Sequence, residues 1–479
     1  MQNAQERLAD AIARHRQGRV AEAEALYRQI LADHPDLAEA HNALGIALKQ
    51  MDRNAEALPC FRRALEAKPD YAAAQSNLGA AYQDLGNMAD AIACYRAAMA
   101  LDEESASAWH NLGSALLITG EMDEAAAMFE RAVALRPDFA GAQNNRGVAC
   151  KALGRAAEAA GAFVRAVEAD PANPMQRYNL AHALLLTGDF ERGWVEHEAR
   201  FDAGIAQLRH ATHPRWMSGD PAGKTILVWA EQGLGDTIQF SRYLPLLAQR
   251  GARVLLEVPQ ALVRLCRSLD GVRVFARGEP LPFYDAQIPL MSLPHQFGTT
   301  LSDIPATLPY LRAEQDLVAD WGRRLGPAER PRIGLVWAGS PTHKDDVNRS
   351  IAPQRLVPLL ARSGVEWLSL QYGHEVTRLP LGTTDLAAGL RDFADTAAVI
   401  CHLDLVIAVD TAVLHLAAAL GRPAWGLLPF APDWRWLLDR DDSPWYPGLR
   451  LFRQDHRGDW DGVVQRLGED LDAWMANGG

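Results

Sequence analysis

Two short segments of the chain carry residue types that can bind a negatively charged ligand. In the first, Gly233-Leu234-Gly235-Asp236 follows the apolar run 225–229 and precedes the stretch 238–249. This order predicts a strand, a glycine turn and a helix. Glycines permit positive φ angles and close approach, and the free N–H groups at a helix start can face an anion. By itself the pattern is common, because any tight turn between a parallel strand and a helix can share it.

The second segment combines aspartate, threonine and histidine. The apolar run 403–409 ends at Asp410, and we expect a helix to begin at Thr411. His415 comes four residues after Thr411, so both side chains face the same side of the first helical turn. Ligands of α/β proteins bind at the carboxyl ends of parallel strands, so this segment predicts a site for a pyrophosphate. The alternative for His415 is a packing role inside the helix.

The composition of the chain, and with it the secondary structure expected to position these segments, changes near residue 210. Eleven of the 13 tryptophans lie from Trp216 onward, whereas alanine dominates the first 200 residues. β-branched apolar runs such as 225–229 and 333–337 alternate with helical stretches in the second half. The sequence therefore predicts an all-helical first half and an α/β second half. A length of 479 residues fits two to four folding units.

The helical half repeats with a period of 34 residues. Glycine, alanine, aromatic and second alanine columns keep this spacing: Gly45, Gly79, Gly113 and Gly147; Ala57, Ala91, Ala125 and Ala159; Phe61, Tyr95, Phe129 and Phe163; Ala64, Ala98, Ala132 and Ala166. Small residues let two antiparallel helices approach, and the aromatic fills the space between them. The pattern, over roughly residues 4 to 200, resembles the tetratricopeptide repeat (TPR) and predicts about six units, including diverged ends.

One column of the repeat is polar. Asn77, Asn111, Asn145 and Asn179 share a position two residues before the glycine column. A ladder of amides offers donors and acceptors and can clamp an extended peptide backbone. The resemblance to the repeat domain of O-linked N-acetylglucosamine transferase implies the same role. Local hydrogen bonding within the repeats is the alternative.

The stretch Val409 to Pro423 closely resembles the nucleotide-sugar motif of the heptosyltransferases, whose first lobe also opens with a Gly-Asp turn. The resemblance covers about residues 216 to 479. It implies the GT-B architecture, with two Rossmann-like lobes. One departure is Ala412, where those enzymes usually have glycine. The tail 432–447 resembles bacterial proteins that fuse TPRs to this domain, some implicated in flagellin glycosylation.

The resemblance also implies roles for single residues. Asp236 corresponds to the general base, and Glu231 is the second candidate for that role. The alternative for Asp236 is a helix cap. The donor would be held by eight residues: Gly233, Gly235, Lys344, Arg349, Asp410, Thr411, Ala412 and His415. Helix dipole and cations can stabilise a leaving phosphate without metal, so we expect no metal and no cofactor. Asp439-Arg440-Asp441 fits a metal-binding D-x-D pattern, but we expect a solvated turn there.

Charge and composition exclude other classes. A formal net charge of −12 makes nucleic acid an unlikely partner. Five cysteines without a C-x-x-C pair fit buried thiols in a reducing compartment. Neither a signal core nor an apolar run of membrane-spanning length is present in the sequence, so we expect a cytoplasmic protein with no membrane span.

These observations predict three domains: a TPR solenoid over residues 1–205, a GT-B N-terminal lobe on the acceptor side over 206–322, and a nucleotide-sugar lobe over 323–479. The expected function is inverting protein O-glycosylation, with a nucleotide-bound sugar, such as a nonulosonic acid like pseudaminic acid, transferred to Ser or Thr of a captured protein. The resemblance points to flagellin as that partner. The alternatives are lipopolysaccharide-type sugar transfer and a non-catalytic scaffold.

Overall fold

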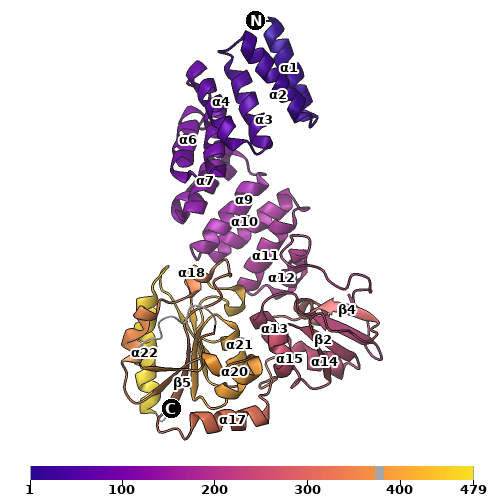
Figure 1. The fold of residues 1–479 in the computed structure, drawn as a ribbon, viewed down its shortest axis with the longest axis vertical. Helices are drawn as coiled ribbons and strands as arrows, with labels where there is room; N and C mark the ends of the chain where they lie inside the picture. Colours follow the sequence, from indigo (N-terminus) through magenta and orange to yellow (C-terminus); the bar gives the residue numbers. More distant parts are fainter. Residues whose placement is uncertain (1, 373–381, 478–479) are drawn as a thin grey trace. The chain divides into compact units, whose positions relative to one another are not determined.

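The computed structural model describes residues 2–372 and 382–477. The chain separates into two compact units, Met1–Asn179 and Leu180–Gly479. The first unit is helical throughout, and the second contains two parallel sheets with their helices (Figure 1). The predicted succession of a helical solenoid and an α/β region is thus confirmed.

The helical unit consists of antiparallel helix pairs that stack on their neighbours. Its helices are α1 (Gln2–Arg16), α2 (Val20–Asp33), α3 (Ala38–Gln50), α4 (Asn54–Ala67), α5 (Ala72–Asp84), α6 (Met88–Leu101), α7 (Ala106–Thr119), α8 (Met122–Leu135), α9 (Ala140–Ala152) and α10 (Ala156–Ala169). The division after Asn179 falls inside α11 (Pro174–Leu186), and α12 (Phe190–His197) belongs to the second unit.

The glycine and aromatic columns pack as the repeat predicts. A Cβ atom on Gly147 would lie 2.6 Å from Cε1 of Phe163, whose side chain is 1% exposed. Gly45 and Phe61 are equally close, at 2.5 Å. The absence of a side chain is what lets the two helices of each pair approach across the ring.

The first sheet of the second unit has strand order β3-β2-β1-β4, with all pairs parallel. Its strands are β1 (Thr225–Trp229), β2 (Arg253–Val258), β3 (Val272–Ala276) and β4 (Ala286–Pro289). The expected helix over 238–249 is two shorter helices, α13 (Leu234–Phe240) and α14 (Tyr243–Gln249). α13 starts directly after the glycine turn that follows β1, so it begins at the carboxyl edge of this sheet.

The second sheet has strand order β10-β9-β8-β5-β6-β7, again parallel. Its strands are β5 (Arg332–Val336), β6 (Glu366–Ser369), β7 (Thr383–Asp385), β8 (Leu405–Val409), β9 (Ala424–Leu428) and β10 (Leu449–Arg453). From β5 the chain continues to one side and from β8 to the other, so the strand order reverses between them. Ligands of open α/β sheets bind at such a point.

Apolar side chains from both faces form the core of this sheet. Ile333, Leu405, Ile407 and Leu427 are at most 1% exposed, as expected for strands covered on both sides. Helix α22 (Trp460–Ala476) packs against them through Val463 and Leu467. Among the described residues, no helix has the length and apolar character needed to cross a membrane.

The tight packing of the repeats yields a first prediction. Gly147→Ala forces the Phe163 ring to shift, and overpacking of this kind costs about 1–3 kcal/mol of unfolding free energy. Gly161, one helix further on, has no atom within 4 Å of an added Cβ, so Gly161→Ala is expected to be neutral or stabilising by up to about 1 kcal/mol. Native-state hydrogen exchange of α9 and α10 peptides measures both effects. Equal protection in the two variants contradicts the packing role.

Candidate active site

The two segments singled out in the sequence lie against each other. α13 packs on α21 (Ala412–Ala419), the helix that follows β8. A Cβ on Gly235 would be 3.0 Å from Cδ2 of His415 and 3.5 Å from Cα of Ala412. The carboxyl edges of the two sheets therefore meet at these helices.

The glycine turn uses only one of the two properties predicted for it. Gly233 has φ −68° and Gly235 lies within α13, so neither residue adopts a positive φ. That part of the expectation is wrong. The requirement at Gly235 is clearance for the imidazole of His415, since any side chain would separate the two helices.

Both carboxylate oxygens of Asp236 are engaged. Oδ2 accepts a hydrogen bond from the backbone N–H of Gly233 at 2.8 Å, which caps the first turn of α13. Oδ1 forms an ion pair with Arg435, whose guanidinium reaches it from the segment after β9. The alternative, Asp236 as the N-cap, is therefore met only in part: Gly233 is the N-cap residue, and Asp236, three residues later, bonds back to its N–H. The same side chain faces the candidate site through Arg435.

Arg435 is a site residue that sequence reasoning missed. Its guanidinium also donates to Asp433 Oδ1 at 2.6 Å and to Gln239 Oε1 at 2.7 Å, and the residue is 8% exposed. Burial opposes its charge, but the carboxylates of Asp433 and Asp236 outweigh burial and raise its pKa. The position of Arg435 between Trp434 and Trp436 was a usable signal, since a charged residue within an aromatic segment is rarely buried without a partner.

The start of α21 supplies unsatisfied polar groups. Thr411 precedes the helix, and its buried hydroxyl has no hydrogen-bond partner. Arg349 Nη1 donates to the carbonyl of Asp410 at 3.2 Å, which brings the loop after β5 to the end of β8. Burial raises the pKa of the Asp410 carboxyl to about 6, and the charge of Asp433 adds to this increase. A free hydroxyl, a cation and the helix N-terminus can thus receive an anion.

His415 is buried and neutral. Its Nδ1 lies 2.9 Å from the Tyr446 hydroxyl, and its ring stacks on Trp436 at 5.2 Å. Burial lowers the pKa of His415 to about 3, and the nearby Arg435 adds to this effect. Its Nε2 lies 3.8 Å from Asp410 Oδ1, beyond hydrogen-bond distance, so the neutral imidazole lies near the end of β8 without an ion pair to it.

Two further predicted residues are less closely associated with this centre. Lys344 is exposed in the loop between β5 and α18 (Asp346–Arg349). Glu231 forms a buried ion pair with Arg200 at 3.0 Å and accepts hydrogen bonds from the backbone N–H groups of residues 290 and 291. Burial raises the pKa of Glu231 despite these contacts. These contacts give Glu231 a structural role at the carboxyl edge of the first sheet.

The asparagine ladder forms a continuous seam inside the helical unit. Each Nδ2 donates to the residue 35 positions earlier: Asn77 to Asn42 at 2.9 Å, Asn111 to Ser76 at 3.1 Å, Asn145 to His110 at 3.3 Å and Asn179 to Asn144 at 2.9 Å. Burial lowers the pKa of His110, in keeping with a neutral ring that accepts this bond. The amides therefore link successive repeats, as in the local hydrogen-bonding alternative, and each keeps further hydrogen-bonding capacity.

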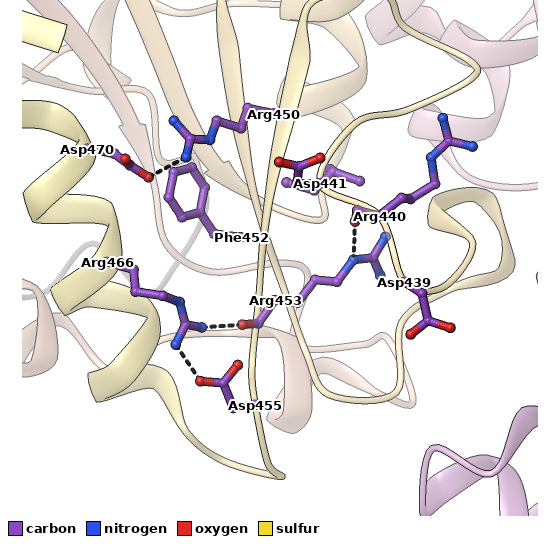
Figure 2. A pocket seen from close by; sticks show the side chains of 10 residues that line it. Asp439, Arg440, Asp441, Arg450, Phe452, Arg453, Asp455, Arg466 and Asp470 are labelled. Carbon is purple, nitrogen blue, oxygen red and sulfur yellow. Dashed lines mark hydrogen bonds and ion pairs between the residues drawn. The ribbon is translucent and has the colours of Figure 1, made fainter. Parts of the chain in front are cut away.

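A separate cavity of about 440 Å³ lies beside β10 and α22 (Figure 2). Its lining includes Asp439, Arg440 and Asp441, the sequence that fits the D-x-D pattern. Four of its other charged residues form ion pairs, Arg450 with Asp470 at 2.6 Å and Arg466 with Asp455 at 2.5 Å, whereas Arg453 donates hydrogen bonds to backbone carbonyls. Across residues 2–372 and 382–477, no group of three or more His, Cys, Asp or Glu side chains could hold a metal ion.

Comparison with known proteins assigns both parts of the chain. Tetratricopeptide repeat families match residues 47–86, 70–138 and 112–174. Glycosyltransferase family 9 (heptosyltransferase) matches residues 375–432, which include Asp410 and His415. The chain thus contains tetratricopeptide repeats and, in its second unit, a segment that matches glycosyltransferase family 9.

The chain is also similar to individual proteins. Protein FlbA of Caulobacter vibrioides is 28% identical over 338 residues, or 63% of this chain, and the match spans just over half of that relative, 56%. Among solved structures, MamA protein is 24% identical with a TM-score of 0.32, covering 36% of this chain and 94% of its own. YrrB, described as a TPR protein with an unusual peptide-binding site, is 20% identical with a TM-score of 0.33, covering 38% and 93%.

The buried imidazole predicts a pH effect on stability. The unfolded chain binds a proton at His415 below pH about 6.5, whereas the folded chain does so only near pH 3. Stability is therefore lost as pH falls through this window. Relative to the non-titrating variant His415→Gln, the wild type should lose about 2 kcal/mol between pH 7 and pH 5.

Urea unfolding followed by tryptophan fluorescence measures this difference, because 12 of the 13 tryptophans lie in residues 180–479. The wild type and His415→Gln are compared at each pH in the same buffer. A difference that stays constant from pH 7 to pH 5 would mean that His415 is protonated in the folded chain.

Proposed function

We propose that this glycosyltransferase-like chain is an inverting protein O-glycosyltransferase of GT-B architecture. Its donor is a nucleotide-linked sugar, such as a nonulosonic acid, and its acceptor is a Ser or Thr hydroxyl of a protein captured by the repeats. The observation that carries the proposal is the contact of Gly235, next to Asp236 in the first turn of α13, with the start of α21. Asp236, whose carboxylate can accept a proton, thereby lies beside the N-terminus of α21, which is suited to bind a leaving phosphate.

The proposed reaction assigns a task to each part. The acceptor oxygen forms a bond to the anomeric carbon as the bond from that carbon to the phosphate oxygen breaks. The electron pair leaves with the nucleotide, and the hydroxyl proton passes to Asp236. Thr411, the backbone N–H groups at the start of α21, and Arg349 balance the charge of the departing phosphate. Lys344 is a further candidate from the same loop.

The repeats supply the second half of the proposal. A solenoid that holds a protein acceptor raises the concentration of its hydroxyl groups near the transferase unit. The resemblance of residues 432–447 points to flagellin as the acceptor. FlbA is a protein to which this chain is similar in sequence. Asn77, Asn111, Asn145 and Asn179 are the proposed contacts, through the hydrogen-bonding capacity left by the seam.

A non-catalytic scaffold is the second candidate, and one observation favours it. Both oxygens of Asp236 already have partners, so a substrate hydroxyl must displace or share one of them. One experiment distinguishes the two candidate functions. The purified protein is mixed with flagellin and candidate nucleotide sugars, and intact-protein mass spectrometry detects any sugar increment. No increment with any donor, together with no nucleotide binding by calorimetry, favours the scaffold.

Replacement of the proposed base yields a prediction. Asp236→Asn keeps an oxygen for the Gly233 cap but cannot take the proton, so transfer should fall at least about 100-fold while donor affinity stays the same. Asp441→Asn is the matched control, because Asp441 is exposed in the turn that borders the separate cavity. It should transfer at the wild-type rate. Full activity of Asp236→Asn removes the base assignment, and loss in Asp441→Asn would instead indicate a metal.

Acceptor capture yields a separate prediction. Replacing both Asn111 and Asn145 with Ala removes two amides from the proposed peptide contacts and should weaken flagellin binding about tenfold or more. Ser76→Ala is the matched control, because it deletes the seam partner of Asn111 but leaves the ladder amide in place. Binding is measured by calorimetry with the full chain. Equal losses in the control and the double variant assign the ladder to structure alone.

A further inference from the structure

Helix α12, which follows the repeats and precedes the first sheet along the chain, is built into the α/β unit through Trp194. The indole of Trp194 is 2% exposed and packs edge-to-face on Trp434 at 5.3 Å. It also contacts Phe240 at 6.2 Å and Trp445 at 6.3 Å. The other three rings come from segments that carry the candidate site: Phe240 ends α13, Trp434 precedes Arg435, and Trp445 precedes Tyr446, whose hydroxyl lies beside His415.

The aromatic cluster supports the cation of the candidate site. The guanidinium carbon of Arg435 lies 4.4 Å from the centre of the Trp434 ring, a cation–π distance. Arg435 in turn forms the ion pair with Asp236. A chain of contacts therefore runs from Trp194 through Trp434 and Arg435 to the proposed base.

The orientation of Trp194 is set by groups other than Trp434. Its indole N–H donates to the carbonyl of Thr299 at 3.0 Å. The hydroxyl of Thr299 lies 2.9 Å from that of Tyr243 in α14, and both residues are buried. Because the far end of the indole is held by the first sheet's own elements, Trp194 can impose its position on Trp434.

We propose that Trp194 is a positioning residue for the transfer reaction, acting through Trp434 to hold Arg435 at Asp236. The proposal rests on the proposed function and adds a residue outside the glycosyltransferase motifs. Trp194 contacts neither Asp236 nor the start of α21 in the described contacts. The proposed route from Trp194 to Asp236 runs through Trp434 and Arg435, and the contact of Trp194 with Phe240 at the end of α13 is the alternative that the test must separate from it. Removal of Trp194 should therefore affect the chemical step more than the binding of either substrate.

The test is a double-mutant cycle in the full chain. The variants are Trp194→Leu, Arg435→Lys and the double change, with Trp460→Leu as control. Trp460 is also a buried tryptophan, 5% exposed, but it packs on the core of the second sheet. Trp194→Leu should lower kcat about tenfold or more and leave both KM values within about threefold. Trp460→Leu should leave kcat unchanged.

The cycle separates positioning from general loss of stability. If Trp194 acts through Arg435, the double variant has the kcat of Arg435→Lys alone, whereas independent effects multiply. Multiplied effects, or an equal loss in Trp460→Leu, overturn the proposal. Should Trp194→Leu fail to fold by circular dichroism, Trp194→Phe replaces it, since it keeps a ring and loses the N–H bonded to Thr299.

A second readout does not need activity. The Nε–H proton of Arg435 donates to Gln239 and should give a slowly exchanging NMR resonance, identified by its loss in Arg435→Lys. Trp194→Leu should shift or broaden this resonance, and Trp460→Leu should leave it in place. If the wild type transfers no sugar, the proposed function fails, and an unchanged resonance in Trp194→Leu then separately rejects the positioning role.

Discussion

The buried guanidinium of Arg435 stands between Asp236 and Asp433, and the geometry of the candidate site depends on it. Asp236 follows strand β1 of the first sheet and Arg435 follows strand β9 of the second, so this ion pair joins the carboxyl edges of both sheets. Breaking a buried pair by losing one partner costs about 3–5 kcal/mol, because an uncompensated charge remains. A hydroxyl that approaches Asp236 competes with Arg435 for the same carboxylate. Charge balance at this point therefore governs both the packing of the unit and any proton transfer in it.

The repeat architecture could be predicted in detail because its determinants are local and recur. The spacing of Gly147 and Phe163 is the spacing of Gly45 and Phe61, and each pair is in contact. The α/β region was predictable for the same reason, since buried strands such as 405–409 appear as short apolar runs. The break of the expected helix after Phe240 was missed although Pro245 signals it. Proline lacks the N–H that would bond the carbonyl of Ser241, so it favours the first turn of a new helix, and α14 begins at Tyr243.

Site residues were predictable only where a motif names them. Asp410, Thr411 and His415 occur together in the sequence, and they lie together in the structure. Arg435 is 199 residues from Asp236, and no local spacing links them. Glu231 shows the converse, because a carboxylate beside a glycine turn has the residue type of a base, but Arg200 engages it in a buried pair. Residue type predicts what a group can do, whereas its partners decide what it does.

The 35-residue separation between donor and acceptor in the asparagine seam bears on how the solenoid could gain or lose repeats. Each amide reaches one residue beyond a 34-residue repeat, so the lateral bond depends on the register between neighbours and on no single position in the array. Duplication or deletion of a whole repeat regenerates the bond at the new junction. Insertion of one residue between two helices would misalign donor and acceptor at that junction alone. Relatives can accordingly differ in array length by complete units and keep a bond from an asparagine amide at every junction.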